Sequence, residues 1–119
     1  MKVAVSAQGP TVHDEVDPRF GRAAYFIIVN TENDSVEVLN NKINANAFKG
    51  AGIQAATMIS DRGVEVLLTG YCGPKAFKVL ETAGVKIAGN ISGSVSRAIT
   101  KLQAGYVRFE KGPNAEAPG

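Results

Sequence analysis

The chain has 119 residues, of which 45% are apolar and 20% charged, and its 13 Lys and Arg against 11 Asp and Glu give a net charge of +2. This length fits one domain, and the composition excludes a disordered chain. The small positive charge does not favour general nucleic-acid binding. A single cysteine excludes the disulfide-rich secreted class, and no apolar run approaches the ~20 residues of a membrane span. A cytoplasmic globular protein without membrane segments is therefore expected.

Three strands are expected within the first forty residues. An apolar run over 2–7 predicts the first, and a continuous run of β-forming side chains over 25–29 predicts the second. Residues 36–39 include alternating apolar and polar side chains, which is typical of a half-buried strand. The Glu-Asn-Asp sequence at 32–34 favours a turn between the last two runs. The second and third strands are therefore expected to form an antiparallel hairpin.

Three helices are expected in the second half, each with apolar side chains at helical spacing. The first covers 50–62 and ends at Gly63, the second opens at Pro74, and the third is capped by Ser92 or Ser94. The side chains expected to be buried on these helices are Ile53, Ala56, Ile59, Phe77, Leu80, Val95, Ala98, Ile99 and Leu102.

Short apolar runs over 64–69 and 85–88 predict a fourth and a fifth strand. The order of elements is then β-β-β-α-β-α-β-α, an α/β fold. Because a strand–helix–strand unit nearly always crosses over right-handed, the fourth and fifth strands are expected to be parallel neighbours. We therefore expect a mixed five-stranded sheet with helices on its faces. It forms a single domain over 1–110, followed by a flexible C-terminal tail over 111–119.

Three glycine-rich connections lead into the helices and are expected at one edge of the sheet, beyond the carboxyl ends of the parallel strands. They cover 49–52, 70–74 and 89–94. Each precedes a helix N-terminus, where backbone N–H groups lack intrahelical partners and the helix dipole favours an anion. Glycine also allows close approach to the backbone, since it has no Cβ. These connections predict an anion-binding site made of backbone amides.

A long polar connection between the first two strands is expected to reach the same edge. It contains Arg19, Arg22 and the sole histidine, His13. Lys49 and Lys75 stand at helix starts, where a cation is unfavourable unless a negative ligand neutralises it. The residues expected to bind the anion are Arg19, Arg22, Lys49, Gly50, Gly52, Cys72, Gly73 and Ser92, with His13 and Cys72 as candidate metal ligands.

Each of these features also has a purely structural interpretation. The glycines fit tight turns, Cys72 fits a small buried side chain, and His13 fits a solvent-facing loop residue. Arg19 and Arg22 are equally compatible with ion pairs to the acidic side chains of their own loop. The convergence of all these residues on one edge favours the functional interpretation.

Several short segments stand out when they are taken together, in their order and spacing. They are VAVS at 3–6, VDPRFGRA at 16–23, GAGIQAA at 50–56, LTG at 68–70, GPKAF at 73–77 and AGVK at 83–86. In this combination the chain resembles the dinitrogenase iron–molybdenum cofactor biosynthesis family, over residues 1 to about 103. The resemblance implies a ribonuclease-H-like three-layer α/β domain, which agrees with the order of elements expected above.

The same resemblance implies a small non-catalytic protein that binds and carries metal–sulfur clusters or cofactor precursors. A stand-alone chain of this size is similar to members that carry a molybdenum–copper sulfide cluster without covalent attachment. Such a cluster is anionic and brings its own sulfide ligands, which suits a site of amides and cations. The implied partners are proteins that donate or accept the cluster, with no nucleic acid and no membrane.

Other functions stay open at this point. A carrier of the iron–molybdenum cofactor or its precursor would rely on His or Cys ligands, and the stretch 40–50 has neither. A nucleotide- or phosphate-binding module would use the same helix ends, although the chain lacks a GxxxxGK[ST] loop and a GxGxxG fingerprint.

Two enzymatic functions fit the sequence less well. A nuclease needs carboxylates clustered at strand ends, whereas the first strand offers Ser6 and the fourth ends in Thr69 and Gly70. An enzyme that uses Cys72 as a nucleophile needs a base nearby, and the sole histidine lies in a distant loop.

Overall fold

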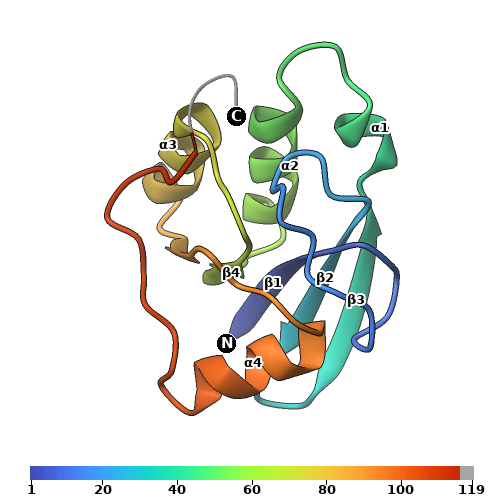
Figure 1. Ribbon diagram of the computed structural model, residues 1–119, viewed down its shortest axis with the longest axis vertical. Coiled ribbons are helices and arrows are strands. Elements are labelled where there is room, and N and C mark those ends of the chain that lie inside the picture. Colours follow the sequence, from blue (N-terminus) through green and yellow to red (C-terminus); the bar gives the residue numbers. More distant parts are fainter. Residues whose placement is uncertain (116–119) are drawn as a thin grey trace.

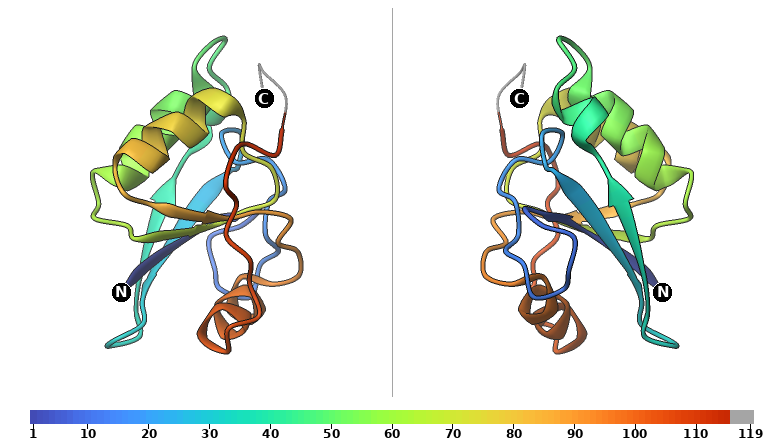
Figure 2. Two further views of the ribbon diagram at one scale, coloured as in Figure 1. Left: turned by 90° about the vertical axis from the view of Figure 1, so that its left-hand side faces the viewer. Right: turned by 90° about the vertical axis from the view of Figure 1, so that its right-hand side faces the viewer.

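The computed structural model describes residues 1–115 and shows a mixed sheet with helices on both faces (Figures 1 and 2). The strands are β1 (Lys2–Ala7), β2 (Tyr25–Asn30), β3 (Ser35–Asn40), β4 (Val66–Leu68) and β5 (Lys86–Ala88). The helices are α1 (Lys42–Ala45), α2 (Ala51–Ser60), α3 (Pro74–Thr82) and α4 (Val95–Gln103). The predicted α/β class is confirmed, and the short helix α1 is an addition to the expected elements. In the part of the chain described, no helix has the length and apolar character needed to cross a bilayer.

The five strands are arranged in the order β3-β2-β1-β4-β5. β2 pairs antiparallel with β1 and with β3, whereas β4 pairs parallel with β1 and with β5. The predicted hairpin and the predicted parallel neighbours are therefore confirmed. The hairpin turn contains Asp34 with a φ of 58°, a conformation that Asp tolerates better than most residues. Because β1, β4 and β5 run in the same direction, their carboxyl ends lie at one edge of the sheet.

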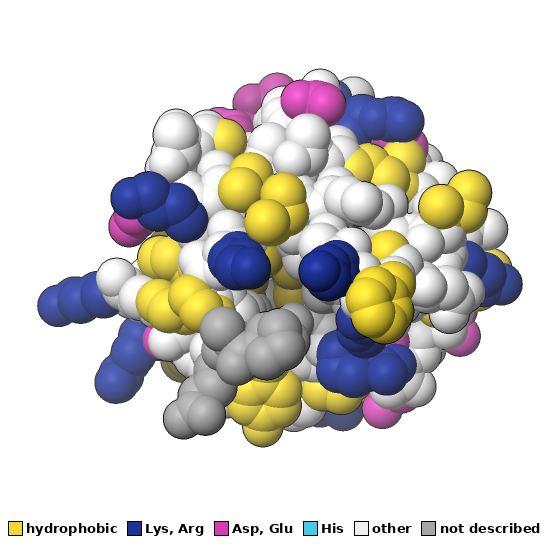
Figure 3. Space-filling model, turned by 90° about the horizontal axis from the view of Figure 1, so that it is seen from above, with side chains coloured by type: hydrophobic (Ala, Val, Ile, Leu, Met, Phe, Trp, Pro, Cys, Tyr) yellow, Lys and Arg dark blue, Asp and Glu magenta, His cyan; other side chains and the backbone are white. Residues whose placement is uncertain are grey.

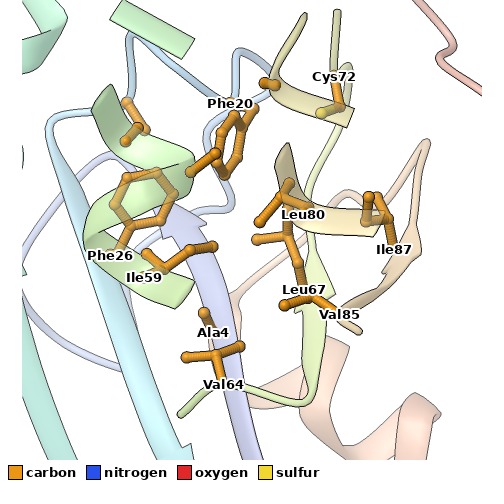
Figure 4. Close-up of a cluster of buried hydrophobic side chains, with 14 of the residues drawn as sticks. Ala4, Phe20, Phe26, Ile59, Val64, Leu67, Cys72, Leu80, Val85 and Ile87 are labelled. Carbon is orange, nitrogen blue, oxygen red and sulfur yellow. The ribbon is translucent and has the colours of Figure 1, made fainter. Parts of the chain in front are cut away.

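Two apolar clusters fill the layers on either side of the sheet, because alternate side chains of each strand point to opposite faces. The cluster under α2 and α3 includes Phe26, Leu67 and Leu80 (Figure 4). The cluster under α4 includes Val5 and Leu102. Helices α2 and α3 therefore lie side by side on one face, and α4 covers the other (Figure 2). This division decides which helix starts can meet.

The apolar faces of α3 and α4 are those predicted, whereas α2 differs at its start. Ala56 and Ile59 are buried as expected, but Ile53 is 38% exposed and Ala55 is fully buried. Ile53 lies in the first turn of α2, at the end of the apolar layer, where it borders the cavity described below. The three-residue spacing alone placed it wrongly in the core.

The C-terminal strap, residues 106–115, runs from the end of α4 along the sheet to the start of α3 (Figures 1 and 2). Phe109 forms an antiparallel bridge with Ala88 at the edge strand. Further on, Asn114 hydrogen-bonds the turn between β4 and α3. The segment predicted as a tail is thus bonded to the domain as far as Asn114, while 116–119 lie outside the described residues.

The N-terminal cap of α4 can be tested by mutation. Ser94 Oγ accepts the Arg97 backbone N–H at 3.3 Å, which settles the choice between the two predicted serines. We expect Ser94→Ala to lower the free energy of unfolding by about 1 kcal/mol, since a first-turn amide loses its partner. Urea unfolding followed by circular dichroism measures this change. Ser92→Ala, at an exposed position outside the cap, should leave the midpoint unchanged, and equal effects of the two variants would contradict the assignment.

Candidate anion-binding site

An open cavity of about 600 Å³ lies at the edge of the sheet, between the first turns of α2 and α3. Four cations line it, and none of the described lining residues is Asp or Glu. Figure 3 looks onto this end of the molecule and shows Lys and Arg with hydrophobic side chains around the middle of the face, and acidic side chains toward the rim. The cationic residues are Arg19, Arg22, Lys49 and Lys75, and the larger apolar residues are Phe20, Phe48, Ile53, Tyr71 and Pro74.

Backbone hydrogen bonds fasten the long polar connection to the end of β4. The Tyr71 N–H donates to Pro18 O at 2.6 Å, and the Phe20 N–H donates to Tyr71 O at 3.1 Å. The Phe20 ring is buried and packs against Phe26 with 5.2 Å between the ring centroids. These contacts fix the segment that carries Arg19 against the cavity wall.

Two glycines make this close approach possible. A Cβ on Gly70 would lie 2.5 Å from Pro18 Cα, and a Cβ on Gly21 would lie 2.6 Å from the backbone of Gly52. Contacts this short do not occur for real side chains, so only glycine permits the two segments to meet. Gly70, in one of the three glycine-rich connections, and Gly21, in the long polar connection, therefore both serve close backbone packing.

Arg19 is oriented by a buried carboxylate. Asp17 is 3% exposed, and its Oδ1 accepts the Arg19 backbone N–H at 2.9 Å and contacts Arg19 Nε at 3.5 Å. The ion pair within the loop, which the sequence left open as an alternative, is thus present for Arg19. Its side chain remains 65% exposed, so its outer N–H groups are available at the cavity wall.

Arg22 bonds to backbone carbonyl groups, and not to the acidic side chains that the sequence left open as partners. Its Nη1 donates to Ala45 O at 2.7 Å and to Ala47 O at 3.3 Å, at the end of α1. These bonds hold the connection that presents Phe48 and Lys49 to the cavity. A guanidinium has five N–H donors, so Arg22 can fasten this connection and still present donors to a ligand.

The starts of α2 and α3 bring to the same place backbone amides that have no hydrogen-bond partner within residues 1–115. Neither helix has a side-chain cap at its N-terminus, and α3 begins with Pro74, which has no N–H. The first-turn residues Gly52, Ile53, Lys75 and Ala76 all line the cavity. Two positive helix ends therefore face one space, which is favourable for an anion.

The start of α4 is not part of this arrangement. Its first-turn amides donate to the chain's own backbone, from Val95 to Asp14 O at 2.9 Å and from Ser96 to Val12 O at 2.8 Å. Because α4 covers the opposite face of the sheet, Ser92 lines a separate, smaller cavity of about 290 Å³. The structure does not bring the third glycine-rich connection to the main cavity, which corrects the expectation for Ser92.

The two candidate metal ligands lie apart from each other, and neither is among the residues that line the cavity. His13 is exposed in the turn beside the start of α4. Cys72 is 1% exposed, and it lies at the upper end of the apolar cluster under α3 (Figure 4). Desolvation by burial raises the pKa of its thiol from 9.0 to about 12. Within residues 1–115, no three His, Cys, Asp or Glu side chains are grouped in a way that could hold a metal ion.

The structure therefore brings together six of the predicted site residues and adds others. The six are Arg19, Arg22, Lys49, Gly50, Gly52 and Gly73. Sequence reasoning missed the apolar part of the wall, above all Phe48, which is 93% exposed, and Tyr71, which is 51% exposed. The sequence did contain a signal for Phe48: it is a large apolar side chain that precedes Lys49 and Gly50 and belongs to no predicted strand or helix.

Known proteins resemble this chain in both sequence and fold. The family model described as dinitrogenase iron-molybdenum cofactor matches residues 1–105. The structure of the apo form of the orange protein from Desulfovibrio gigas is 42% identical, with a TM-score of 0.93 over 96% of each chain. The structure of a candidate NifB protein from Thermotoga is 37% identical, with a TM-score of 0.80 over 91% of each chain. An uncharacterized protein from Methanocaldococcus jannaschii is 29% identical over 114 residues, which are 92% of each chain.

The contact between Gly21 and Gly52 can be tested directly. We expect Gly21→Ala to lower the free energy of unfolding by about 1–3 kcal/mol, because the added Cβ would overlap the backbone of α2. Thermal and urea unfolding measure the loss. Gly112→Ala is the matched control, since its Cβ would have open space around it, and an equal loss in both variants would contradict the close approach.

The raised pKa of Cys72 predicts a pH dependence of stability. The folded protein holds the thiol proton more tightly than the unfolded chain, so this contribution is complete below about pH 9 and is lost as the pH rises toward 12. Above about pH 9 we expect the free energy of unfolding to fall by roughly 1 kcal/mol per pH unit more in the unmodified protein than in Cys72→Ala. Urea unfolding at several pH values measures both slopes, and parallel slopes would contradict the shift.

Proposed function

The chain belongs to the dinitrogenase iron–molybdenum cofactor family, and on this premise we propose that it carries an anionic metal–sulfur cluster in the cavity between α2 and α3. One observation carries the proposal: two uncapped helix starts and four cations line the same cavity, with no acidic residue among the described lining residues. Like charges gathered on one wall repel each other, and a bound anion removes that repulsion. The proposed role is binding and release, without a covalent step.

The chemistry of the wall supports a cluster that brings its own ligands. The charged groups at the cavity are the guanidinium and ammonium groups of its arginines and lysines, and together with backbone N–H donors they bind anions rather than metal ions. The apolar residues Phe48, Ile53 and Tyr71 suit the weakly hydrated, polarizable surface of a metal sulfide. A cavity of about 600 Å³ is much larger than the ~30 Å³ that one water molecule takes up in the liquid, so it has room for a cluster of several atoms.

The specific cargo that we propose is a molybdenum–copper sulfide cluster, as the resemblance of this stand-alone chain implies. The similarity to the orange protein supports this choice. The alternative cargo is the iron–molybdenum cofactor or a precursor, which the name of the family and the similarity to a candidate NifB protein favour.

Residues 1–110 form the cluster-binding unit, to which the strap adds Ala115 at the cavity wall. The strand order, with an antiparallel β2 between β3 and β1, supports a ribonuclease-H-like fold. We place the exchange with cluster donor and acceptor proteins in the cytoplasm, because a lone buried cysteine is typical of chains that do not depend on disulfides.

Reconstitution tests the cargo. The protein incubated with tetrathiomolybdate and a copper(I) salt should yield a coloured complex that survives gel filtration and contains molybdenum and copper in fixed proportion to protein. Iron in protein purified without oxygen would instead indicate the alternative cargo. A melting temperature that rises with nucleotide or phosphate but not with tetrathiomolybdate would contradict the proposal and favour a phosphate-binding module.

A charge reversal tests the cavity. Lys75 lines it, whereas Lys78 lies on the same helix outside the wall. We expect Lys75→Glu to raise the dissociation constant for the tetrathiomolybdate–copper complex about tenfold, equivalent to ~1.4 kcal/mol, and Lys78→Glu to leave it nearly unchanged. Titration followed by visible absorption measures both constants. Equal weakening by the two variants would mean that net charge, and not this cavity, governs binding.

A further inference from the structure

We propose that Asn114 is a positioning residue of the cavity, through which the C-terminal strap holds the β4–α3 turn in place and separates Cys72 from the bound ligand. The effect on ligand binding rests on the function proposed above. The effect on Cys72 does not depend on that function, and it can be measured in the protein alone.

Three hydrogen bonds join Asn114 to the turn. Its Nδ2 donates to Gly70 O at 2.9 Å, its Oδ1 accepts the Cys72 N–H at 2.8 Å, and its own N–H donates to Cys72 O at 3.2 Å. The residue between, Tyr71, makes its two backbone bonds to Pro18 and Phe20 on the opposite side. The segment 70–72 is thus held like a strand between two neighbours, with alternate residues bonded to each.

The path of the strap is fixed before it reaches the turn. The Glu110 N–H donates to Ile87 O at 2.7 Å, and Phe109 bridges Ala88. The strap then crosses the end of β5 at Gly89, where a Cβ would lie 2.4 Å from Asn114 Nδ2. A glycine at this crossing therefore lets the Asn114 side chain reach the turn. Beyond it, Ala115 lines the cavity.

Asn114 controls what the turn presents to the cavity. Tyr71 and Gly73 line the wall on either side of Cys72, whose side chain is buried in the apolar cluster instead. The Cys72 N–H would be a further amide donor at this corner, but it already donates its hydrogen bond to Asn114 Oδ1. With the strap in place, the turn offers the tyrosine and the start of α3 to a ligand, while the thiol and the Cys72 amide are withheld.

An amide side chain is required for this role, because it donates and accepts at once. In Asn114→Asp the Cys72 N–H keeps an acceptor, but a carboxylate cannot donate to Gly70 O. In Asn114→Ala both side-chain bonds are lost. Both variants therefore lose the bond to Gly70 O, and Ser94→Ala provides a control that destabilises the protein at the opposite face without contacting the turn.

The first measurement uses the protein without any cluster and follows the rate at which iodoacetamide alkylates Cys72 at about pH 8. We expect Asn114→Ala to react at least about tenfold faster than the unmodified protein, because the lost bonds favour local opening of the strap. Asn114→Asp, which would place a carboxylate oxygen against Gly70 O, should also react faster, and Ser94→Ala should react at the unmodified rate. An unchanged rate in Asn114→Ala overturns the proposal. Equal acceleration in Ser94→Ala also overturns it, since global unfolding would then expose the thiol.

The second measurement is the affinity for the tetrathiomolybdate–copper complex, together with the melting temperature of each variant. We expect Asn114→Ala to bind about tenfold more weakly, and Ser94→Ala to bind as the unmodified protein does although it is also less stable. If the loss of affinity follows the loss of melting temperature in all variants, the positioning role is overturned. If the unmodified protein does not bind the complex, the proposed cargo is wrong, and the alkylation rates alone decide on the strap.

Discussion

The candidate site depends on close backbone contact between the segment 17–21 and the ends of β4 and α2. This contact exists because Gly70 and Gly21 have no Cβ to hold the segments apart. It converts a long polar connection into a fixed wall that carries Arg19 and ends at Arg22. Elsewhere in the fold, strands and helices are joined by apolar packing, which tolerates moderate changes of side chain. Here the two backbones lie so close together that only the hydrogen atom of a glycine fits between them.

The distribution of helices over the two faces of the sheet determines which helix ends remain free for a ligand. α2 and α3 share one face, so their starts meet above the same strand ends. α4 packs on the other face, and the amides of its first turn donate to the backbone of residues 12–14. The chain thus uses one helix start to fix its own long connection and leaves two uncapped at the cavity. The same connection serves both purposes, since its first part docks on α4 and its last part forms the cavity wall.

Most of the secondary structure could be predicted from the sequence, with the short helix α1 as the exception, whereas only part of the site could. β1, the hairpin and the faces of α3 and α4 follow from apolar periodicity, which is a local property of the chain. The position of Ser92 depends on the choice of sheet face for α4, which no local pattern contains. The contacts of Asn114 join residues more than forty positions apart. Asn is common in turns and loops, so its presence in the sequence does not indicate such a contact. Ile53 has the correct spacing for the core, yet it lies beyond the end of the apolar layer.

The way in which a cargo is held determines how it can be released. A cluster bound through N–H donors and cations keeps its own sulfide ligands, so leaving the cavity requires no exchange of bonds at the metal. A thiolate on the wall would compete with those sulfides for the metal, and the soft metals prefer such a ligand. Cys72 is adjacent to the cavity, but burial raises the pKa of its thiol to about 12. The thiol therefore stays protonated near neutral pH and does not form the thiolate that would be a strong metal ligand. The apolar cluster under α3 and the hydrogen bonds of Asn114 therefore act together: one keeps the sulfur neutral, and the others hold it on the far side of the turn.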